Sequence, residues 1–387
     1  MSWVFIQPCD VWLFRDNRPL PAGGGSIARG FFPPMPTTVQ GALRALVLGH
    51  ANVDWRAYRE QSTPEARALG EKIGYPAKGN WKASLGAFRM AGPFLAREER
   101  DELMCYFPLP ADVRRIKKPV GDTGRVYFTL RPRRTAGFDA NWPATAPGLK
   151  PLWPPDDEAD HEIPEEEWLD VRGMNAYLNN QSFSDLERRH LFGKERRLGV
   201  ALDYARRGVR ERMLYQVEFV RPEDGVGLLV RLDNAEDLIG REGVMSLGGE
   251  ARAARYRLAP DTSVVKHTTP LGALKRFKLV LLTPAYFDGG WQPKDGNIGW
   301  SRLLGAPVEL VAAALGKPQR VGGWDLAKGW HKPIRAYVPA GSVYYFQAEA
   351  PVALPETLCL TQTPEGELPF DRLGFGQVAV GPWEWLS

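Results

Sequence analysis

A triple glycine lies just before the start of an expected helix in the stretch PAGGGSIARGFFPPMPTTVQGALRAL, residues 21–46. Successive backbone N–H groups without side chains can approach a phosphate closely, and the N-terminus of a helix also attracts anions. We therefore expect an anion cradle at Gly23, Gly24, Gly25 and Ser26. A tight turn is the alternative, because glycine adopts positive φ without steric cost.

Two further glycine clusters lack the spacing of a nucleotide-binding motif. Gly248 and Gly249 lie in SLGGEARAARYRL, and Gly374, Gly376 and Gly381 lie in RLGFGQVAVGPW. The last three have the spacing GxGxxxxG and run into an expected strand, whereas the dinucleotide fingerprint GxGxxG opens a helix. The motif GxxxxGK[ST] is missing as well. The sequence therefore argues against a dinucleotide-binding fold and against ATP hydrolysis.

Lysine and arginine are clustered along the chain, although the net charge is only +4. The first cluster consists of Arg114, Arg115, Lys117, Lys118, Arg125, Arg131, Arg133 and Arg134. The second consists of Arg188, Arg189, Lys194, Arg196, Arg197, Arg206, Arg207, Arg210 and Arg212. An acidic block lies between them, at 156–167. Basic clusters are the footprint of nucleic-acid binding, but a solvated face has the same composition, so both interpretations stay open.

Histidine and cysteine show no arrangement that would hold a metal. The five histidines are His50, His161, His190, His267 and His331, and they form no HExxH motif. The three cysteines are Cys9, Cys105 and Cys359, which are far apart and have no CxxC spacing. We therefore expect no metal site, no cofactor and no disulfide framework.

Length and composition indicate a folded protein of two domains. The chain has 387 residues, more than the roughly 100–200 usual for one domain. Its first residues, MSWVFIQPCDVWLF, have no basic lead and no cleavage site, and no apolar run approaches the roughly 20 residues of a membrane span. We therefore expect a soluble protein of the reducing cytoplasm with no membrane partner.

Strands outnumber helices in the expected secondary structure. The clearest helix follows Pro36, where Thr37 or Thr38 could cap it, and Val39, Ala42, Leu43, Leu46 and Val47 form one apolar stripe. Residues 110–165 are polar and rich in proline, which predicts a long insertion. The runs LGVALDY and MLYQVEFV flank an arginine-rich connection and predict a protruding hairpin at about 196–220.

An internal echo predicts that the chain arose by duplication. A polar, proline-containing passage at 259–274 separates two similar endings, SLGGEARAARYRL and RLGFGQVAVGPW. Each has a leucine, a glycine-rich turn and then an expected strand. We therefore expect two α+β units that each end in a glycine-rich loop.

The opening PCDVWLFRDNRPLPAGGGSIARGFFPPMPTTVQGALRAL resembles the start of the third subunit of the type III-B, or Cmr, CRISPR effector complex. The segments LGGEARAARY, RVGGWDLAKGWHKPIRAYVPAGSVYYF and LGFGQVAVGPW resemble the same subunit family in order and rough spacing. The resemblance covers both ends and most of the chain between them, and 110–165 is covered least. The chain is thus similar to the CRISPR-associated RAMP proteins.

The resemblance implies an α+β fold of two ferredoxin-like, RRM-related RAMP domains with glycine-rich loops and a long irregular insertion. The expected domains are residues 1–262, with the insertion at about 110–165 and the hairpin at about 196–220, and residues 270–387. It also implies a non-catalytic subunit that grips the crRNA 5′ handle. Its expected partners are the large polymerase-like subunit and the backbone RAMP subunits, and it meets target RNA only indirectly.

Residue by residue, the resemblance assigns RNA contact to the three glycine loops. These are Gly23, Gly24, Gly25 and Ser26, then Gly248 and Gly249, then Gly374, Gly376 and Gly381. We add Arg15, Arg29 and Arg44 as phosphate contacts because they lie near the first loop in sequence. In related backbone subunits a comparable hairpin wedges into the guide where handle and spacer meet. The same is expected here of Arg206, Arg207 and Arg210.

Two other functions stay open. Some RAMP relatives cleave precursor crRNA without metal, with a histidine or tyrosine that activates the 2′-hydroxyl, and His50 would be the candidate. The end of a helix also suits an imidazolium, so His50 needs no catalytic role. A protein-only adaptor would leave both basic clusters as solvated surface. Trp324 and Trp330, in the expected loop GGWDLAKGW, are candidates for base stacking, although buried tryptophan is more usual.

Overall fold

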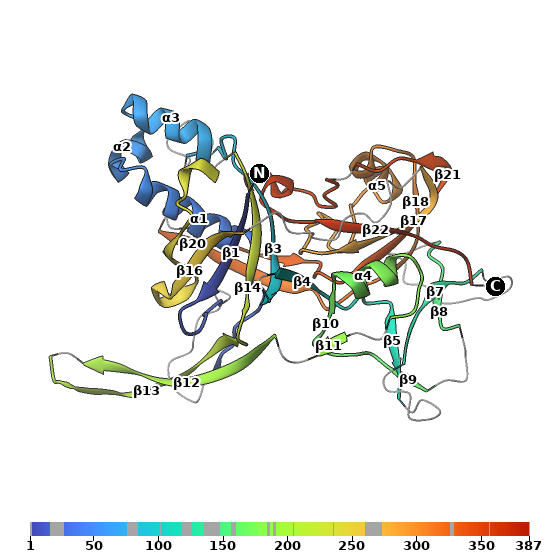
Figure 1. Cartoon of the computed structure of the whole chain (residues 1–387), viewed down its shortest axis with the longest axis horizontal. Coiled ribbons are helices and arrows are strands. Elements are labelled where there is room, and N and C mark those ends of the chain that lie inside the picture. The colour runs from blue at the N-terminus through green and yellow to red at the C-terminus, as the bar shows by residue number, and fades with distance from the viewer. Residues whose placement is uncertain are drawn as a thin grey trace. The chain divides into compact units, whose positions relative to one another are not determined.

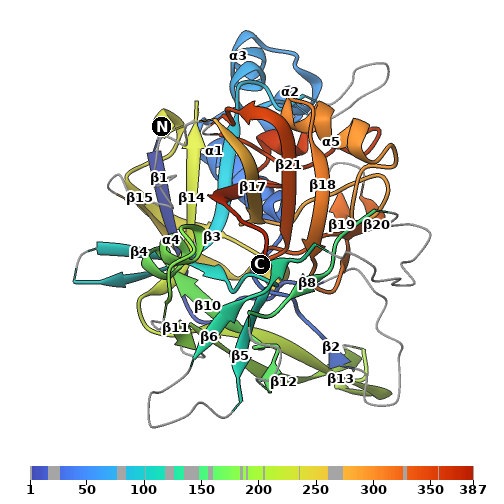
Figure 2. The same ribbon diagram turned by 90° about the vertical axis from the view of Figure 1, so that its right-hand side faces the viewer.

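The computed structural model describes residues 2–15, 27–75, 84–100, 102–117, 126–134, 148–155, 160–183, 186–188, 191–203, 205–234, 236–259, 273–325, 329–355 and 357–386. In these ranges the protein is a mixed α/β structure of mostly strands and few helices (Figure 1, Figure 2). It divides into two compact units. The first is Met1–Glu102, Arg189–Asp261 and Arg320–Arg335; the second is Leu103–Arg188, Thr262–Gln319 and Ala336–Ser387.

The first unit has an antiparallel sheet with the strand order β3-β14-β1-β16-β15. Its strands are β1 (Ser2–Pro8), β3 (Arg89–Glu99), β14 (Val226–Asp233), β15 (Glu242–Ser246) and β16 (Ala253–Ala259). The central strand β1 pairs with β14 on one side and β16 on the other. Its residues Val4, Phe5 and Ile6 are all buried, which explains their continuous apolar run.

Three helices follow β1, namely α1 (Pro36–His50), α2 (Trp55–Glu60) and α3 (Pro64–Ile73). The predicted helix is α1, and it buries Val39, Leu43, Leu46 and Val47. The predicted cap at Thr37 or Thr38 is wrong. Met35 is the N-cap without a side-chain hydrogen bond, because Pro36 occupies the first helical turn with a φ already suited to a helix.

Two hairpins complete the first unit. Strands β12 (Phe192–Asp203) and β13 (Gly208–Pro222) pair antiparallel, and β2 (Ile27–Ala28) pairs parallel with β13. Figure 1 shows β12 and β13 as a long arm. Strands β19 (Gln319–Asp325) and β20 (Trp330–Tyr337) form a separate two-stranded sheet.

The second unit has a four-stranded antiparallel sheet with the order β18-β21-β17-β22. Its strands are β17 (Leu274–Leu281), β18 (Glu309–Ala314), β21 (Val343–Val352) and β22 (Val378–Pro382), and α5 (Asn297–Leu304) follows β17. Phe277, Leu279, Trp300 and Phe346 belong to its buried core. Strand β10 (Glu167–Asp170) pairs with β4 (Glu102–Pro108) and β11 (Leu186–Arg188), and α4 (Val171–Leu178) follows it.

The described part of the predicted insertion at 110–165 consists of short strands. They are β5 (Val113–Ile116), β6 (Tyr127–Thr129), β7 (Arg131–Pro132), β8 (Leu152–Trp153) and β9 (His161–Glu162). Strand β5 pairs with β6 and β9, and β7 pairs with β8. The segment is therefore not wholly irregular.

The two units repeat one strand order, apart from β15. If the four strands of each unit are numbered along the chain, their order across the sheet is second, third, first, fourth. This order is β3-β14-β1-β16 in the first unit and β18-β21-β17-β22 in the second. An α-helix follows the first strand in each, whereas 3₁₀ helices (Glu236–Leu238, Gly249–Ala251 and Phe370–Arg372) lie between the third and fourth. A ferredoxin-like unit has a second α-helix there. The repeated order favours the predicted duplication; the two ferredoxin-like domains and the boundaries 1–262 and 270–387 stay predictions.

Candidate nucleic-acid interface

The hairpin β12–β13 carries three of the predicted RNA contacts, Arg206, Arg207 and Arg210. Its strands pair from Phe192 opposite Pro222 to Asp203 opposite Gly208, with a bulge between Val200 and Leu202. The predicted hairpin is therefore present, and it is longer than the 196–220 expected from the sequence. Long paired strands hold the connecting turn away from the base of the hairpin.

The turn of this hairpin presents arginine to solvent. The carboxylate of Asp203 accepts hydrogen bonds from the N–H groups of Ala205, at 3.1 Å, and Arg206, at 3.2 Å. Such an Asx turn fixes the backbone locally. Arg206 and Arg207 are exposed, and Arg207 has a φ of +50°. Arg210 lies in β13, and its side chain is outside the described residues.

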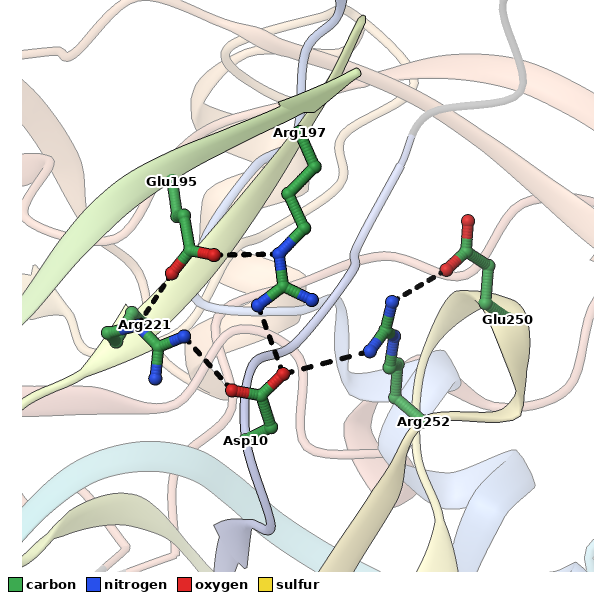
Figure 3. A network of polar contacts seen from close by, with 6 residues as sticks. All are labelled: Asp10, Glu195, Arg197, Arg221, Glu250 and Arg252. Atoms are coloured by element: carbon green, nitrogen blue, oxygen red, sulfur yellow. Dashed lines mark hydrogen bonds and ion pairs between the residues drawn. The ribbon is translucent and has the colours of Figure 1, made fainter. Parts of the chain in front are cut away.

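A closed ring of four charged side chains lies at the base of the hairpin (Figure 3). Arg197 donates to Glu195 at 2.6 Å and to Asp10 at 3.0 Å. Arg221 donates to the other oxygens of the same two carboxylates, at 2.6 and 2.9 Å. These arginine hydrogen bonds hold the pKa of Asp10 and of Glu195 below the usual values. The ring thus ties both strands of the hairpin to the segment after β1.

The ring continues to the second glycine loop through Arg252. This guanidinium lies 2.9 Å from Glu250 and 3.8 Å from Asp10 (Figure 3). The guanidinium carbons of Arg252 and Arg197 lie 4.7 and 5.0 Å from the centre of the buried Phe219 ring. Cation–π contact therefore adds to the ion pairs in holding the hairpin base.

The flanks of the first glycine stretch meet the hairpin base and the second glycine loop. Trp12 and Val220 exchange two backbone hydrogen bonds of 2.8 Å, and the N–H of Gly249 donates to the carbonyl of Leu13 at 2.7 Å. Arg15 bridges to Gly30 across the first glycine stretch. A small core lies beneath these contacts, made of Val11, Leu13, Ala28, Val217 and Phe219. The fold therefore brings the second predicted loop and the residues that flank the first glycine stretch to the base of the hairpin.

The predicted contacts around the first loop have different surroundings. Gly23, Gly24, Gly25 and Ser26 lie outside the described residues. Arg15 and Arg29 are exposed. Arg44 is half-buried, and its guanidinium donates to the Tyr58 hydroxyl at 3.1 Å, so it has a contact within the helices.

Gly248 and Gly249 have a packing reason to be glycine. Gly248 has a φ of +93°, and a Cβ there would lie 2.6 Å from the carbonyl oxygen of Leu13. A Cβ at Gly249 would lie 3.1 Å from the Leu13 side chain. RNA contact at these two glycines stays a prediction.

The third loop belongs to the second unit and uses its N–H groups internally. Those of Phe375, Gly376 and Gln377 donate to Phe370 O, Pro284 O and the Thr283 hydroxyl. Phe375 is buried and stacks on Phe370, with ring centres 4.3 Å apart.

Gly374 and Gly376 have φ of +93° and +66°. Gly381 lies in β22, where a Cβ would meet the carbonyl of Leu178. These glycines allow close packing, and their RNA contact also stays a prediction.

The first basic cluster pairs with the acidic block that follows it. Arg115 bonds Glu162 and Glu167, and Lys117 lies 3.0 Å from Asp160. These pairs form because β5 and β9 are neighbouring strands. Arg115 and Lys117 therefore have acidic partners within the chain.

Sequence reasoning missed most of the charged ring. Asp10, Glu195 and Arg252 are far apart in sequence. The available signal was strand alternation. It places Glu195 and Arg197 on the same face of their strand, and it likewise places Phe219 and Arg221 on the same face of the partner strand. Pairing between the faces is set by the fold.

The last features to place are His50, the groups that could hold a metal, and the length of the helices. His50 is the exposed last residue of α1, and a Cβ at Gly240 would lie 3.8 Å from its ring. Among the described residues, no three His, Cys, Asp or Glu side chains are grouped so that they could hold a metal ion. Within the same residues, every helix is too short or too polar to span a membrane.

Comparison with known proteins gives one family. A family model described as "CRISPR-associated protein (Cas_Cmr3)" matches residues 4–383. The comparison with curated proteins found no match. A solved structure described as the type III-B Cmr-beta bound to cognate target RNA and AMPPnP, state 1, contains a chain that is 16% identical, with a TM-score of 0.43. The same complex bound to cognate target RNA contains one that is 17% identical, with a TM-score of 0.44. Each match covers 89% of this chain and 86% of the other.

Proposed function

Because the chain belongs to the Cas_Cmr3 family of CRISPR-associated proteins, the third subunit of the type III-B (Cmr) complex, we propose that it grips the crRNA 5′ handle there. It acts in the cytoplasm without catalysis. It joins the large polymerase-like subunit to the backbone RAMP subunits, and it meets target RNA only through the assembled complex.

The observation that carries the RNA-binding proposal is the anchored hairpin. Two exposed arginines, Arg206 and Arg207, lie at the turn of paired strands whose base is fixed by the charged ring. An exposed guanidinium at the end of a rigid arm suits phosphate, because its fixed donors match phosphate oxygens. The hairpin would place these charges where handle and spacer meet.

The experiment compares the double variant Arg206→Ala/Arg207→Ala with a control that loses the same charge elsewhere. The control is Arg56→Ala/Arg302→Ala, whose side chains are also exposed and pair with Glu60 and Asp295. Binding of crRNA to the purified chain is measured over a range of salt concentrations. Each lost phosphate contact should reduce the slope of log affinity against log salt by about 0.7 on single-stranded RNA.

In the hairpin variant, we expect the slope of log affinity against log salt to be smaller by about 1.4, because two contacts are lost at about 0.7 each. In the control, we expect the slope to be unchanged. Deletion of 205–211 should also expose the guide nucleotide at the junction of handle and spacer to chemical probing in the assembled complex. Equal slopes for the two variants, or unchanged protection of that nucleotide, would contradict the proposal.

A further inference from the structure

Strands β19 and β20 form a two-stranded sheet (Figure 2). Two apolar side chains of β20 are largely exposed. Trp330 is 70% exposed and Ile334 is 57% exposed. Side chains of a strand alternate between its faces, so Trp330, Lys332 and Ile334 share one face. Trp330 is more exposed than any other large apolar side chain that the structure describes, whereas indole is mostly buried in folded proteins.

Lys332 lies on this face between the two apolar side chains. A Cβ added to Gly323 would lie 3.6 Å from the Cδ atom of Lys332, so the lysine stem runs beside the glycine of the neighbouring strand. Lysine often lays its methylene stem along apolar surface and keeps its ammonium in water. The face therefore combines an aromatic ring, an aliphatic side chain and a cation.

The charge of the same stretch has one sign. Residues 320–335 contain four Lys and Arg and one Asp, which leaves a net charge of +3. Of these, Arg320, Lys332 and Arg335 lie in the two strands with described side chains, and Arg320 is exposed. A purely apolar partner would gain nothing from this charge, whereas a polyanion with flat bases would use both the ring and the cations.

We propose that this stacking face, defined as Trp330, Lys332 and Ile334, binds an unpaired nucleotide of single-stranded RNA. The base stacks on the indole of Trp330, and the adjoining phosphates lie toward the basic side chains. The proposal rests on the proposed RNA-binding function and adds a second contact, separate from the turn of β12–β13. Stacking tolerates any base, because every base has a π face.

The test uses the full-length chain and three variants. Trp330→Ala removes the ring, Trp330→Phe keeps a smaller one, and Trp55→Ala removes another exposed tryptophan, which is 57% exposed on α2. For each protein, binding is measured to a 5′-handle RNA and to a series of versions of this RNA. Each version lacks one base, so that one nucleotide is an abasic ribose. The abasic series keeps every phosphate, so it reports stacking separately from charge.

We expect Trp330→Ala to weaken binding of the intact RNA by roughly 5- to 150-fold, the range for one base stacked on an aromatic ring. Trp330→Phe should retain much of the affinity, and Trp55→Ala should bind as the wild type does. One abasic position should weaken the wild type and leave Trp330→Ala unaffected. The salt slope should be the same in all variants.

Three outcomes would overturn the proposal. If the wild type binds RNA and Trp330→Ala binds it equally well, the stacking face fails while the proposed function stands. If Trp330→Ala keeps its RNA affinity but loses copurifying protein subunits, the face binds protein instead. If the wild type binds neither the intact 5′-handle RNA nor any of its abasic versions, the proposed function fails, and the stacking face fails with it.

Discussion

Gly376 illustrates how close packing can require a glycine. Its φ is +66°, and a Cβ would lie 2.6 Å from Thr361 and 2.7 Å from the carbonyl carbon of Leu360. Its own carbonyl accepts the N–H of Leu360 at 2.6 Å, so the two backbones are held together. Both the backbone angle and the space exclude a side chain.

We expect Gly376→Ala to lower the free energy of unfolding by about 1–3 kcal/mol or more, from backbone strain with added crowding. The matched control is Gly366→Ala, because Gly366 has a similar φ of +78° but no heavy atom within 4 Å of a Cβ. Chemical denaturation of both variants separates the two causes. Equal losses would mean that the approach of Leu360 adds nothing.

Lys278 is a buried cation of the second unit. Its ammonium donates to the carbonyl of Tyr177 at 3.1 Å and to Asn180 at 3.2 Å, and it lies 3.8 Å from the centre of the Tyr177 ring. Burial lowers the pKa of Lys278 to about 8, although the charge of Asp112 opposes that shift. Asp112 is also buried, and it accepts hydrogen bonds from the hydroxyls of Tyr177 and Tyr345.

This lowered pKa predicts that stability rises with pH above about 8. Between the folded pKa of about 8 and the ordinary value of 10.5, the unfolded chain binds the proton more readily than the folded chain does. Raising the pH across this window therefore favours the folded state, by up to about 3 kcal/mol. Denaturation at pH 7.5–9.5 should show this rise in the wild type, and Lys278→Met should lack it. A slope that survives in Lys278→Met would assign the effect to another group.

At the scale of elements, the charged ring decides how firmly the hairpin β12–β13 is held. Asp10 contacts Arg197, Arg221 and Arg252, so it joins both strands of the hairpin and the second glycine loop. These side chains are partly exposed, and salt screens such pairs. The ring should therefore affect local opening of the hairpin more than global stability.

We expect Asp10→Asn to increase hydrogen exchange in β12 and β13 and to leave exchange in β1 and β14 nearly unchanged. High salt should produce the same pattern in the wild type. The matched control is Asp237→Asn, because Asp237 forms an exposed ion pair with Lys72, at 3.0 Å. Uniform exchange in all strands after Asp10→Asn would contradict a local role.

The sequence predicted several elements and few of the contacts between them. Helix α1 and the hairpin β12–β13 were predictable because each has local periodicity or a turn flanked by apolar runs. The cap of α1 was not, since Pro36 can start a helix without a side-chain cap. Pairing of Arg115 with Glu162 and Glu167 depends on strand neighbours that are 47 and 52 residues apart.

The candidate site shows the same limit. Arg206 and Arg207 were predicted at a turn, and the described turn exposes both. Arg44 was grouped with the first loop by sequence proximity, but a helix side chain points to its neighbouring helix, where Tyr58 accepts its hydrogen bond. Trp330 was expected in a loop, but it is the first residue of strand β20, and its exposure could be learned only from the fold.

At the scale of the whole molecule, much of the chain's charge is used within the chain. The net charge is +4, and many of the described arginines bond to carboxylates, including those of the ring and of the first basic cluster. The proposed RNA binding would therefore depend on a few exposed groups rather than on a broad basic surface. Such a protein suits a scaffold that acts beside other subunits.

A scaffold of this kind predicts that the purified chain leaves repeat RNA uncut, and that His50 is dispensable. A general base must reach the 2′-hydroxyl of its substrate and commonly contributes about 10²–10⁴-fold to the rate. His50 is the exposed last residue of α1, a position at which a basic side chain needs no catalytic role. We therefore expect His50→Ala to leave crRNA length, complex activity and repeat RNA unchanged.

The assay incubates wild-type and His50→Ala protein with labelled repeat RNA in the presence of EDTA, so that a metal-dependent contaminant stays silent. Arg59→Ala, a charged-residue variant in the last turn of α2, is the control for loss of a basic side chain near a helix end. Cleavage by the wild type that falls at least about 10²-fold in His50→Ala and persists in Arg59→Ala would establish the ribonuclease alternative, because only loss of the base has an effect of that size. Cleavage equal in all three proteins would point to a different base, and an intact repeat in all three agrees with a subunit that binds RNA without cutting it.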